Sequence, residues 1–408
     1  MRILFASVPV LLAPLLPPDP APVLQGKPWI RYTIDNTASG ADGVKITDTK
    51  TDGRPDIATA WEEGGLIRAY FNPSRVDSRT PWPQVTVGRV ASPEDAVFAD
   101  LDRDLAFDVV SACEGKERTV YIHWAPKSPD RFWQSDAWTT TPIAASQGRM
   151  MWMFVQPMQV DGRNGPDLVA GGKGPGAEIG WFEAPANARD TAAWKWHPLR
   201  PVGWIMSIYT VDMDADGDLD ILFSDRKGER TGVYWLENPR VKGAPFDAAA
   251  AWPEHAVGST GREVMFIDYT DADGDGLPDV AAAVKPRDIQ IHHRLSRDGT
   301  RWKTAEMSLP AAATGTAKSV RITDVNADGK LDVIYSAEQT PPGASGVVWR
   351  ALDDSALHDI SGPEGIKYDF IELLDLDGDQ DLDVVTTEEN FGADSKGLGL
   401  IWYENPGR

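Results

Sequence analysis

The chain has 408 residues, of which 42% are hydrophobic, so it can bury a large core and is not intrinsically disordered on composition. Its 62 acidic and 40 basic residues give a formal net charge of −22, which argues against nucleic acid and anionic membranes as partners. The single cysteine, Cys113, excludes an intrachain disulfide and a thiolate metal site.

Residues 1–22 have the features of a secretory leader. One basic residue, Arg2, precedes a short apolar run that extends to Leu16, and a proline-rich segment follows to Pro22. The run is too short and too rich in proline to span a bilayer comfortably. We therefore expect a signal peptide, a secreted or periplasmic location and no membrane insertion. An ordinary disordered N-terminus is the alternative.

From residue 27 onward, one unit repeats along the chain. Each unit has an apolar run, an Asp-rich loop that ends in an aspartate, and a second apolar run. The spacing of 51 to 59 residues between these closing aspartates is close to the length of a four-stranded propeller blade. The closing aspartates are Asp56, Asp108, Asp167, Asp220, Asp279, Asp332 and Asp383.

Two further segments complete each unit. The third segment is aromatic, as in residues 179–185, 233–239 and 400–406. The fourth begins near a tryptophan: Trp138, Trp194, Trp252 or Trp302. Because all four segments are short, rich in β-branched and aromatic residues, and bounded by Gly, Pro and Asn, we expect four β-strands per unit. No stretch has the periodicity of a helix.

Seven such sheets predict an all-β fold, a single seven-bladed β-propeller over residues 27–408. A radial arrangement of this kind protects the edges of its sheets. The last unit stops after its third strand, at Asn405 and Pro406, whereas residues 29–34 have the sequence of a fourth strand. We expect this N-terminal strand to close the ring as the outer strand of blade seven.

The Asp-rich loops place carboxylates at alternate positions, with a glycine for the tight turn. Hard oxygen ligands in this arrangement favour Ca²⁺ over Zn²⁺. Three loops have the full pattern, and the loop of blade seven keeps its acids but has Gln380 in place of the glycine. We expect calcium in these four loops, bound by Asp212, Asp214, Asp216, Asp220, Asp271, Asp273, Asp275, Asp279, Asp324, Asn326, Asp328, Asp332, Asp375, Asp377, Asp379 and Asp383.

The other three loops depart from the pattern. In blade two Leu105 replaces the glycine, and in blade one Lys50 occupies the second ligand position, where its ammonium group would compete with a cation. Blade three has Gln159 and Arg163 at ligand positions, so we expect no ion in the blade-three loop. The alternative is that the aspartates only build turns by accepting backbone hydrogen bonds. An EF-hand is excluded because its twelfth position lies in a strand and is not Glu; it is Phe223, Ala282, Tyr335 or Thr386.

This loop pattern resembles the FG-GAP and VCBS-type repeats of propeller domains, including those of integrin α-subunits. The resemblance covers the chain after residue 27 and implies calcium in such loops on one face. The Phe-Gly and Gly-Ala-Pro signatures are absent at their expected places, so an integrin-like adhesive role does not carry over. Residues 61–65, 92–98 and 197–204 are similar in style to the propeller part of aldos-2-ulose dehydratases, which eliminate water from sugar ketones.

The position six residues after each closing aspartate is charged in all seven units. The acids are contiguous around the ring, and so are the bases: Glu338, Glu389, Glu62 and Glu114, then Lys173, Arg226 and Lys285. Six residues before each loop the chain has Asp42, Glu94, Met153, Met206, Met265, Lys318 and Asp369. Because neighbouring strands run antiparallel, we expect both sets near the axis on the face opposite the Asp-rich loops.

Carboxylates that face cations in a concave site can remove a proton and stabilise the resulting anion. We therefore predict a site for a small molecule, a carbohydrate, on this face. If it is an enzyme, it is a sugar lyase or dehydratase: Glu62, Glu114 or Glu389 supplies the base, and Lys173, Arg226 or Lys285 holds the enolate. A structural ion network and a non-enzymatic scaffold that binds protein are the alternatives.

The six histidines indicate no catalytic site. We place His123 and His292 at the third-strand position of Trp235 or Trp402, and His293 follows directly, so we expect packing roles.

Overall fold

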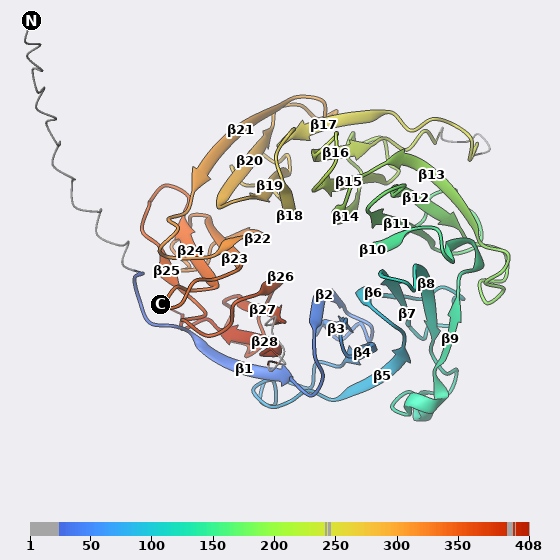
Figure 1. Cartoon of the computed structure of the whole chain (residues 1–408), viewed down its shortest axis with the longest axis horizontal. Helices are drawn as coiled ribbons and strands as arrows, with labels where there is room; N and C mark the ends of the chain where they lie inside the picture. Colours follow the sequence, from blue (N-terminus) through green and yellow to red (C-terminus); the bar gives the residue numbers. More distant parts are fainter. Residues whose placement is uncertain (1–23, 241–242, 244–245, 390–394, 396, 408) are drawn as a thin grey trace, which may run out of the picture.

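A computed structural model describes residues 24–240, 243, 246–389, 395 and 397–407. Within these residues, seven four-stranded antiparallel sheets are arranged around a central axis (Figure 1). The chain is an all-β seven-bladed propeller, as the repeat predicts. The expected signal peptide at residues 1–22 lies outside the described residues.

The first four blades follow the chain from the axis outward. Blade one contains β2 (Ala41–Thr47), β3 (Asp56–Trp61), β4 (Leu66–Tyr70) and β5 (Gln84–Arg89). Blade two contains β6 (Pro93–Ala99), β7 (Asp108–Cys113), β8 (Thr119–Trp124) and β9 (Thr139–Pro142). Blade three contains β10 (Met151–Met158), β11 (Asp167–Lys173), β12 (Glu178–Glu183) and β13 (Lys195–Pro201). Blade four contains β14 (Ile205–Val211), β15 (Asp220–Asp225), β16 (Gly232–Leu236) and β17 (Glu254–Gly258).

Blades five and six are also built from consecutive strands, and blade seven combines strands from both ends of the chain. Blade five contains β18 (Val264–Thr270), β19 (Asp279–Val284), β20 (Asp288–Arg294) and β21 (Trp302–Ser308). Blade six contains β22 (Thr316–Thr323), β23 (Asp332–Glu338), β24 (Val347–Ala351) and β25 (His358–Asp359). Blade seven contains β26 (Tyr368–Leu374), β27 (Asp383–Glu388), β28 (Gly399–Glu404) and β1 (Ile30–Asp35), with β1 paired to β28.

The described helices are three 3₁₀ turns, η1 (Pro129–Arg131), η2 (Ser135–Ala137) and η3 (Ala144–Ser146). Among these residues, no helix has the length and apolar character needed to cross a membrane.

The second strand of each blade lies between two neighbouring sheets and is therefore almost wholly buried. Every residue of β3, β7, β19 and β27 is buried, whereas the outer strand β21 is mostly exposed. Trp61, Trp181, Trp235 and Trp402 have no exposed surface. Complete burial of a large apolar side chain contributes roughly 1.5–3 kcal/mol, so these contacts between blades hold the ring together.

Each innermost strand has a register shift near its beginning, at a bulge. In blade two the shift falls between Pro93 and Asp95, and in blade six between Ala317 and Ser319. The residues within these shifts, Glu94 and Lys318, leave the regular alternation of the strand. The same irregularity occurs in β2, β10, β14, β18 and β26. It lies at the end of each strand that faces the charged side of the ring.

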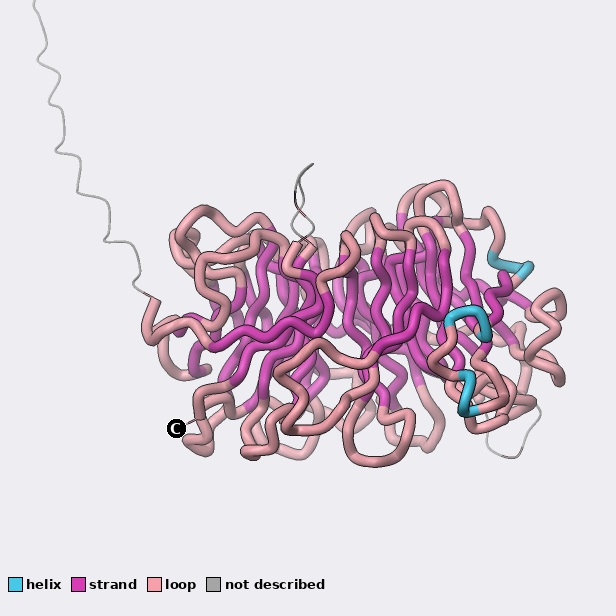
Figure 2. Tube along the Cα trace, turned by 90° about the horizontal axis from the view of Figure 1, so that it is seen from below, coloured by secondary structure: helices cyan, strands magenta, loops and turns pink. Residues whose placement is uncertain are grey.

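The loops gather on the two faces of the layer of strands (Figure 2). The Asp-rich loops join each innermost strand to the second strand on one face. The second strands then run back and end on the opposite face. We refer to these as the loop face and the charged face.

Candidate functional site

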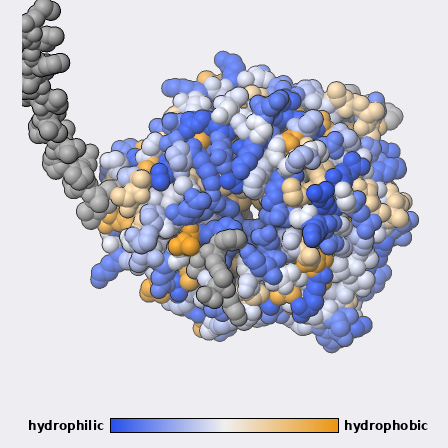
Figure 3. Space-filling model, viewed as in Figure 1, coloured by the Kyte–Doolittle hydropathy of each residue, from blue (hydrophilic) through white to orange (hydrophobic). Residues whose placement is uncertain are grey.

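A cavity of about 330 Å³ lies at the axis on the charged face. Its lining combines residues from the ends of the second strands with residues from the bulges of the innermost strands. The first group is Glu62, Glu114, Lys173, Arg226, Glu338 and Glu389, and the second is Asp42, Glu94, Met153, Met206, Lys318 and Asp369. Hydrophilic residues surround the central opening of the ring (Figure 3). The repeat positions chosen from the sequence therefore meet in one place.

Lys285 is not among the residues that line this cavity. Its ammonium group forms an ion pair with Glu338 of the next blade. Lys285 therefore acts on the cavity only through Glu338, and the predicted role of holding an enolate does not fit its position.

The expected separation of charge into two arcs is incomplete. Lys318 lies in the acidic half, with its Nζ 3.4 Å from Asp369 Oδ2, and Lys367 forms an ion pair with Glu389. At the boundary between the arcs, Lys173 binds Glu114 of the neighbouring blade. Lys367 occupies a repeated position that the sequence analysis did not select, two residues before Asp369, where its carbonyl oxygen accepts a hydrogen bond from the N–H of Glu389.

Several carboxylates on the acidic side approach each other closely. One oxygen each from Asp42, Glu62 and Glu94 lies within 4.8 Å of the others, and the same holds for Asp42, Asp369 and Glu389. Asp369 is almost fully buried, and its Oδ1 has no hydrogen-bond donor among the described residues. Neighbouring carboxylates of this kind cannot all be ionised, so they share protons or bind a cation.

The pKa values within this cluster diverge. Burial, followed by the charges of Asp369 and Glu389, raises the pKa of Asp42 well above its ordinary value. Burial also raises the pKa of Glu389 to about 7, against the effect of Lys318. For Asp369 burial is the largest effect and acts in the same direction, but Lys318, the hydrogen bond with Asp42 and Lys367 together outweigh it, and the pKa is lowered. Acid and base forms thus coexist at neutral pH, as proton transfer requires.

Trp204 provides an aromatic surface on the basic side. The Lys173 Nζ lies 4.5 Å and the Arg226 Cζ 4.4 Å from the centre of its ring. The indole Nε1 is buried and has no hydrogen-bond acceptor among the described residues. Trp204 directly precedes β14 at the repeat position that Lys367 occupies in blade seven, and sequence reasoning did not select this position.

Phenylalanines close the floor of the cavity. Phe154 and Phe266 line this cavity and also a second one of about 530 Å³ on the loop side of the axis. Their ring centroids are 5.8 Å apart with the planes at 87°, and Phe370 packs edge-on against Phe266. In the second cavity Arg321 is paired with both Asp268 and Glu372 at 3.0 Å. Among the described residues, buried polar side-chain atoms without a hydrogen-bond partner occur in the lining of the cavity on the charged face and not in that of the second cavity.

On the loop face, the closing aspartates bind backbone groups. Asp220 is buried, and its two carboxylate oxygens accept hydrogen bonds from the N–H groups of Asn238 and Met213, both at 2.8 Å. Asp167 makes the same contacts with Ala184 and Val160 in blade three, where we expect no ion. These aspartates therefore tie the third strand to the loop whether or not the loop binds a cation.

Two loops contain an acid that the sequence pattern did not select. Asp218 and Asp381 follow the position of the turn glycine, and the Oδ1 atom of each is buried without a hydrogen-bond donor among the described residues. Burial and the neighbouring loop carboxylates raise their pKa values, to about 6 for Asp218 and about 7 for Asp381. Carboxylate oxygens without a donor, among converging carboxylates, fit a bound cation. The sequence signal that could have identified these two residues is the continued alternation of acids along each loop.

Basic side chains reach some loops and not others. In blade seven, Arg79 is 2.8 Å from Asp377, and in blade two Arg189 is 2.5 Å from Asp102. Within the described part of the chain, no ion pair links a basic side chain to the predicted ligands of blades four and six. These two loops are therefore the ones with the most uncompensated negative charge.

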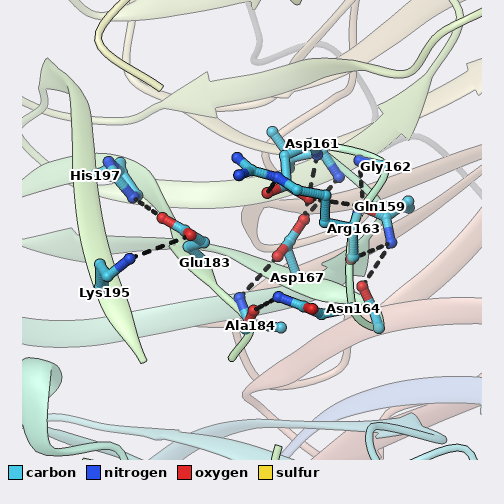
Figure 4. A network of polar contacts seen from close by, with 12 residues as sticks. Gln159, Asp161, Gly162, Arg163, Asn164, Asp167, Glu183, Ala184, Lys195 and His197 are labelled. Atoms are coloured by element: carbon cyan, nitrogen blue, oxygen red, sulfur yellow. Dashed lines mark hydrogen bonds and ion pairs between the residues drawn. The ribbon is translucent and has the colours of Figure 1, made fainter. Parts of the chain in front are cut away.

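The loop of blade three is held by its own side chains (Figure 4). Arg163 forms an ion pair with Asp161 at 2.8 Å, and Gln159 Nε2 donates to the carbonyl oxygen of Gly165 at 2.6 Å. Asn164 donates to the carbonyl oxygen of Ala184 at 2.7 Å. A guanidinium group thus lies in the register of a ligand position, where the full pattern has an acid.

The strand register corrects the placement of two histidines. His292 pairs with Val280 and His123 with Val109, which is the position of Leu236 and Tyr403 rather than of Trp235. Both imidazoles are buried, and His123 bonds to the hydroxyl groups of Ser111 and Thr140 at 2.9 Å. Burial lowers the pKa of His123 to about 3. Their role is internal packing, one register position from where we expected them.

A comparison with protein families supports the repeat assignment over part of the chain. Residues 271–335 match the family described as FG-GAP-like repeat. The match runs from the Asp-rich loop of blade five to the fourth residue of β23 in blade six. Two crystal structures of BBS1N in complex with ARL6DN, one soaked with mercury and one with lead, have a similar arrangement with a TM-score of 0.49 and 10% identity. They cover 92% and 93% of this chain and 96% and 97% of their own. The comparison with curated proteins found no match.

Proposed function

We propose that this propeller is an exported protein that binds a carbohydrate in the cavity of the charged face and calcium in loops of the opposite face. The observation that carries the carbohydrate site is the cavity itself, with paired carboxylates on one side and Trp204 flanked by Lys173 and Arg226 on the other. Its volume of about 330 Å³ is at the lower end for small-molecule sites and suits a single sugar ring.

The two sides of the cavity suit different parts of a sugar. Lys173 and Arg226, whose cationic groups lie over the ring of Trp204, donate hydrogen bonds to hydroxyl groups of the sugar. Carboxylates such as Glu62 accept hydrogen bonds from further hydroxyl groups. These contacts orient a ring without demanding a charged ligand.

The same cavity has groups suited to elimination of water next to a sugar carbonyl. A carboxylate of Glu62 or Glu389 takes the proton from the carbon beside the carbonyl, and Lys173 or Arg226 stabilises the enolate oxygen. Loss of the neighbouring hydroxyl group as water then forms the carbon–carbon double bond. The divergent pKa values of Asp42 and Asp369 supply a proton donor and an acceptor in the same cluster.

Calcium binding is supported by the acids of the all-oxygen loops. Asp212, Asp214 and Asp216 would hold it in blade four, with Asp218 as an additional donor, and the corresponding residues would hold it in blades six and seven. The bound ion would neutralise carboxylates that otherwise repel each other. Export is supported by the apolar segment at residues 1–22.

A binding screen tests the carbohydrate site. Thermal unfolding in saturating calcium is measured with neutral, acidic and keto-sugars, since a ligand that binds the native state raises its stability. We expect a stabilising sugar, with the shift lost in Glu62→Gln and in Lys173→Met and kept in the control Asp353→Asn on the outer surface. A melt that no sugar shifts would refute the site and favour the protein-binding scaffold.

A second assay separates binding from catalysis. A stabilising keto-sugar is incubated with the protein, and the ultraviolet absorbance of a conjugated enone is followed. Absorbance that grows with the native protein and not with Glu62→Gln supports a lyase. Binding without any absorbance change would leave a carbohydrate-binding protein and exclude the elimination for that sugar.

A further inference from the structure

The Asp-rich loop of blade five has a neighbour that the other loops lack. The Nδ1 atom of His293, at the end of β20, lies 3.3 Å from Asp273 Oδ2 and 3.2 Å from Asp279 Oδ2. The three donor atoms lie within 4.8 Å of one another. A nitrogen donor therefore faces a pair of loop carboxylates.

The strand register explains why the imidazole reaches the loop. The N–H of Arg294 donates to Asp279 Oδ1 at 2.7 Å, as the N–H of Asn238 does to Asp220 in blade four. His293 thus occupies the position directly before this contact. Its counterparts by the same register are Phe71, Trp124, Glu183, Glu237, Ala351 and Glu404. In the described chain, blade five is the one with a histidine there.

The distances from His293 Nδ1 to the two carboxylate oxygens match those between neighbouring ligands in a metal coordination shell. Donor atoms about 3.0–3.4 Å apart are what tetrahedral or octahedral geometry gives with bonds of about 2.0–2.1 Å. The Asp273 side chain is 41% and the His293 side chain 23% exposed, so an ion and its water ligands have access. Asp279 is held in place by the backbone N–H groups of Arg294 and Ala272, which fixes the direction of its Oδ2.

We propose that the blade-five loop binds a divalent transition metal of the zinc or cobalt class through His293, Asp273 and Asp279. An imidazole nitrogen with two carboxylates favours these ions, whereas calcium prefers oxygen ligands throughout. The all-oxygen loops of blades four and six keep calcium. This assignment is independent of the carbohydrate site and replaces calcium at blade five alone.

The test uses the whole purified protein after removal of metals with EDTA and dialysis. Zinc and calcium are titrated separately by calorimetry into the native protein and into His293→Gln. We expect the variant to lose at least tenfold in zinc affinity at one site, with its calcium titration unchanged. His255→Gln is the matched control, because that imidazole is paired with Glu237 in blade four and should leave zinc binding intact.

A spectroscopic measurement identifies the ligand directly. Copper(II) bound at one equivalent should show nitrogen coupling in its electron paramagnetic resonance spectrum, absent in His293→Gln and present in His255→Gln. Asp273→Asn, a substitution at an exposed side chain, is a second test and should weaken zinc if His293→Gln does not fold. Equal zinc affinity in native protein, His293→Gln and Asp273→Asn would overturn the proposal and leave an imidazole that only contacts two carboxylates. Displacement of zinc by an equal concentration of calcium would overturn it as well.

Discussion

The two faces of the ring use the same residue type for opposite purposes. On the loop face, the buried closing aspartates receive backbone N–H groups on their oxygens, as Asp167 and Asp220 do. On the charged face, buried acids such as Asp369 and Glu389 face other acids and lysines across a cavity. Burial acts to raise carboxyl pKa values on both faces. On the loop face, however, backbone N–H groups bind both oxygens of each of these aspartates, whereas on the charged face Asp369 Oδ1 has no donor among the described residues. A buried acid is thus structural where the main chain satisfies it and a candidate for chemistry where it does not.

The largest effect that follows concerns a closing aspartate. Asp167→Ala leaves the N–H groups of Ala184 and Val160 buried without an acceptor. Since each such group costs about 1–3 kcal/mol, we expect the free energy of unfolding to fall by roughly 2–5 kcal/mol. Chemical denaturation measures it, with Asp353→Asn as the control. A loss as small as that of the control would show that the backbone contacts do not set this face apart.

Calcium removal should have the next largest effect. A site filled at 100 times its dissociation constant stabilises the native state by about 2.7 kcal/mol. We expect EDTA to lower the unfolding temperature, and Asp328→Asn in blade six to lose part of the calcium-dependent shift. Asp161→Asn in blade three should retain all of it. An unfolding temperature that is the same in EDTA and in calcium would assign the Asp-rich loops to turn formation alone.

The pH dependence of stability separates the faces further. The folded pKa of Glu389, about 7, lies above its ordinary value of 4.5, so its protonated form stabilises the fold. This contribution is complete below pH 4.5 and is lost as pH rises through 7. Relative to the native protein, Glu389→Gln should therefore gain roughly 1–3 kcal/mol of stability between pH 5 and pH 8. A gap between the two proteins that stays constant over this range would contradict the raised pKa.

The smallest expected change is in Glu62→Gln. Burial and the neighbouring Glu63 and Glu114 raise the pKa of Glu62, so its charge opposes folding at pH 7. We expect the variant to be as stable as the native protein or more stable, by less than about 0.5 kcal/mol. Denaturant titrations at pH 7 and pH 4 compare them. A clear destabilisation would make Glu62 a structural residue like the closing aspartates.

The sequence predicted the fold because its strongest signals are local. The spacing of the closing aspartates, the alternation of apolar segments with turn residues and the tryptophans before the outer strands all repeat, so a single blade describes the others. The same counting placed Glu62, Glu114, Lys173, Arg226, Glu338 and Glu389 around one cavity. The repeat spacing alone was enough to predict which residues lie together on the charged face.

Only the tertiary structure decided how these residues pair. Lys367 and Trp204 line the cavity from one repeat position, directly before an innermost strand, where the residue type differs from blade to blade. Lys285 pairs with Glu338 and is not among the residues that line the cavity. His293 reaches the loop of blade five because the strand register shifts the expected position of the preceding histidine by one residue. The repeat spacing determines where a residue lies along its strand and which face of the ring it is near. The partner of a charged side chain depends on distances between blades, which no single repeat contains.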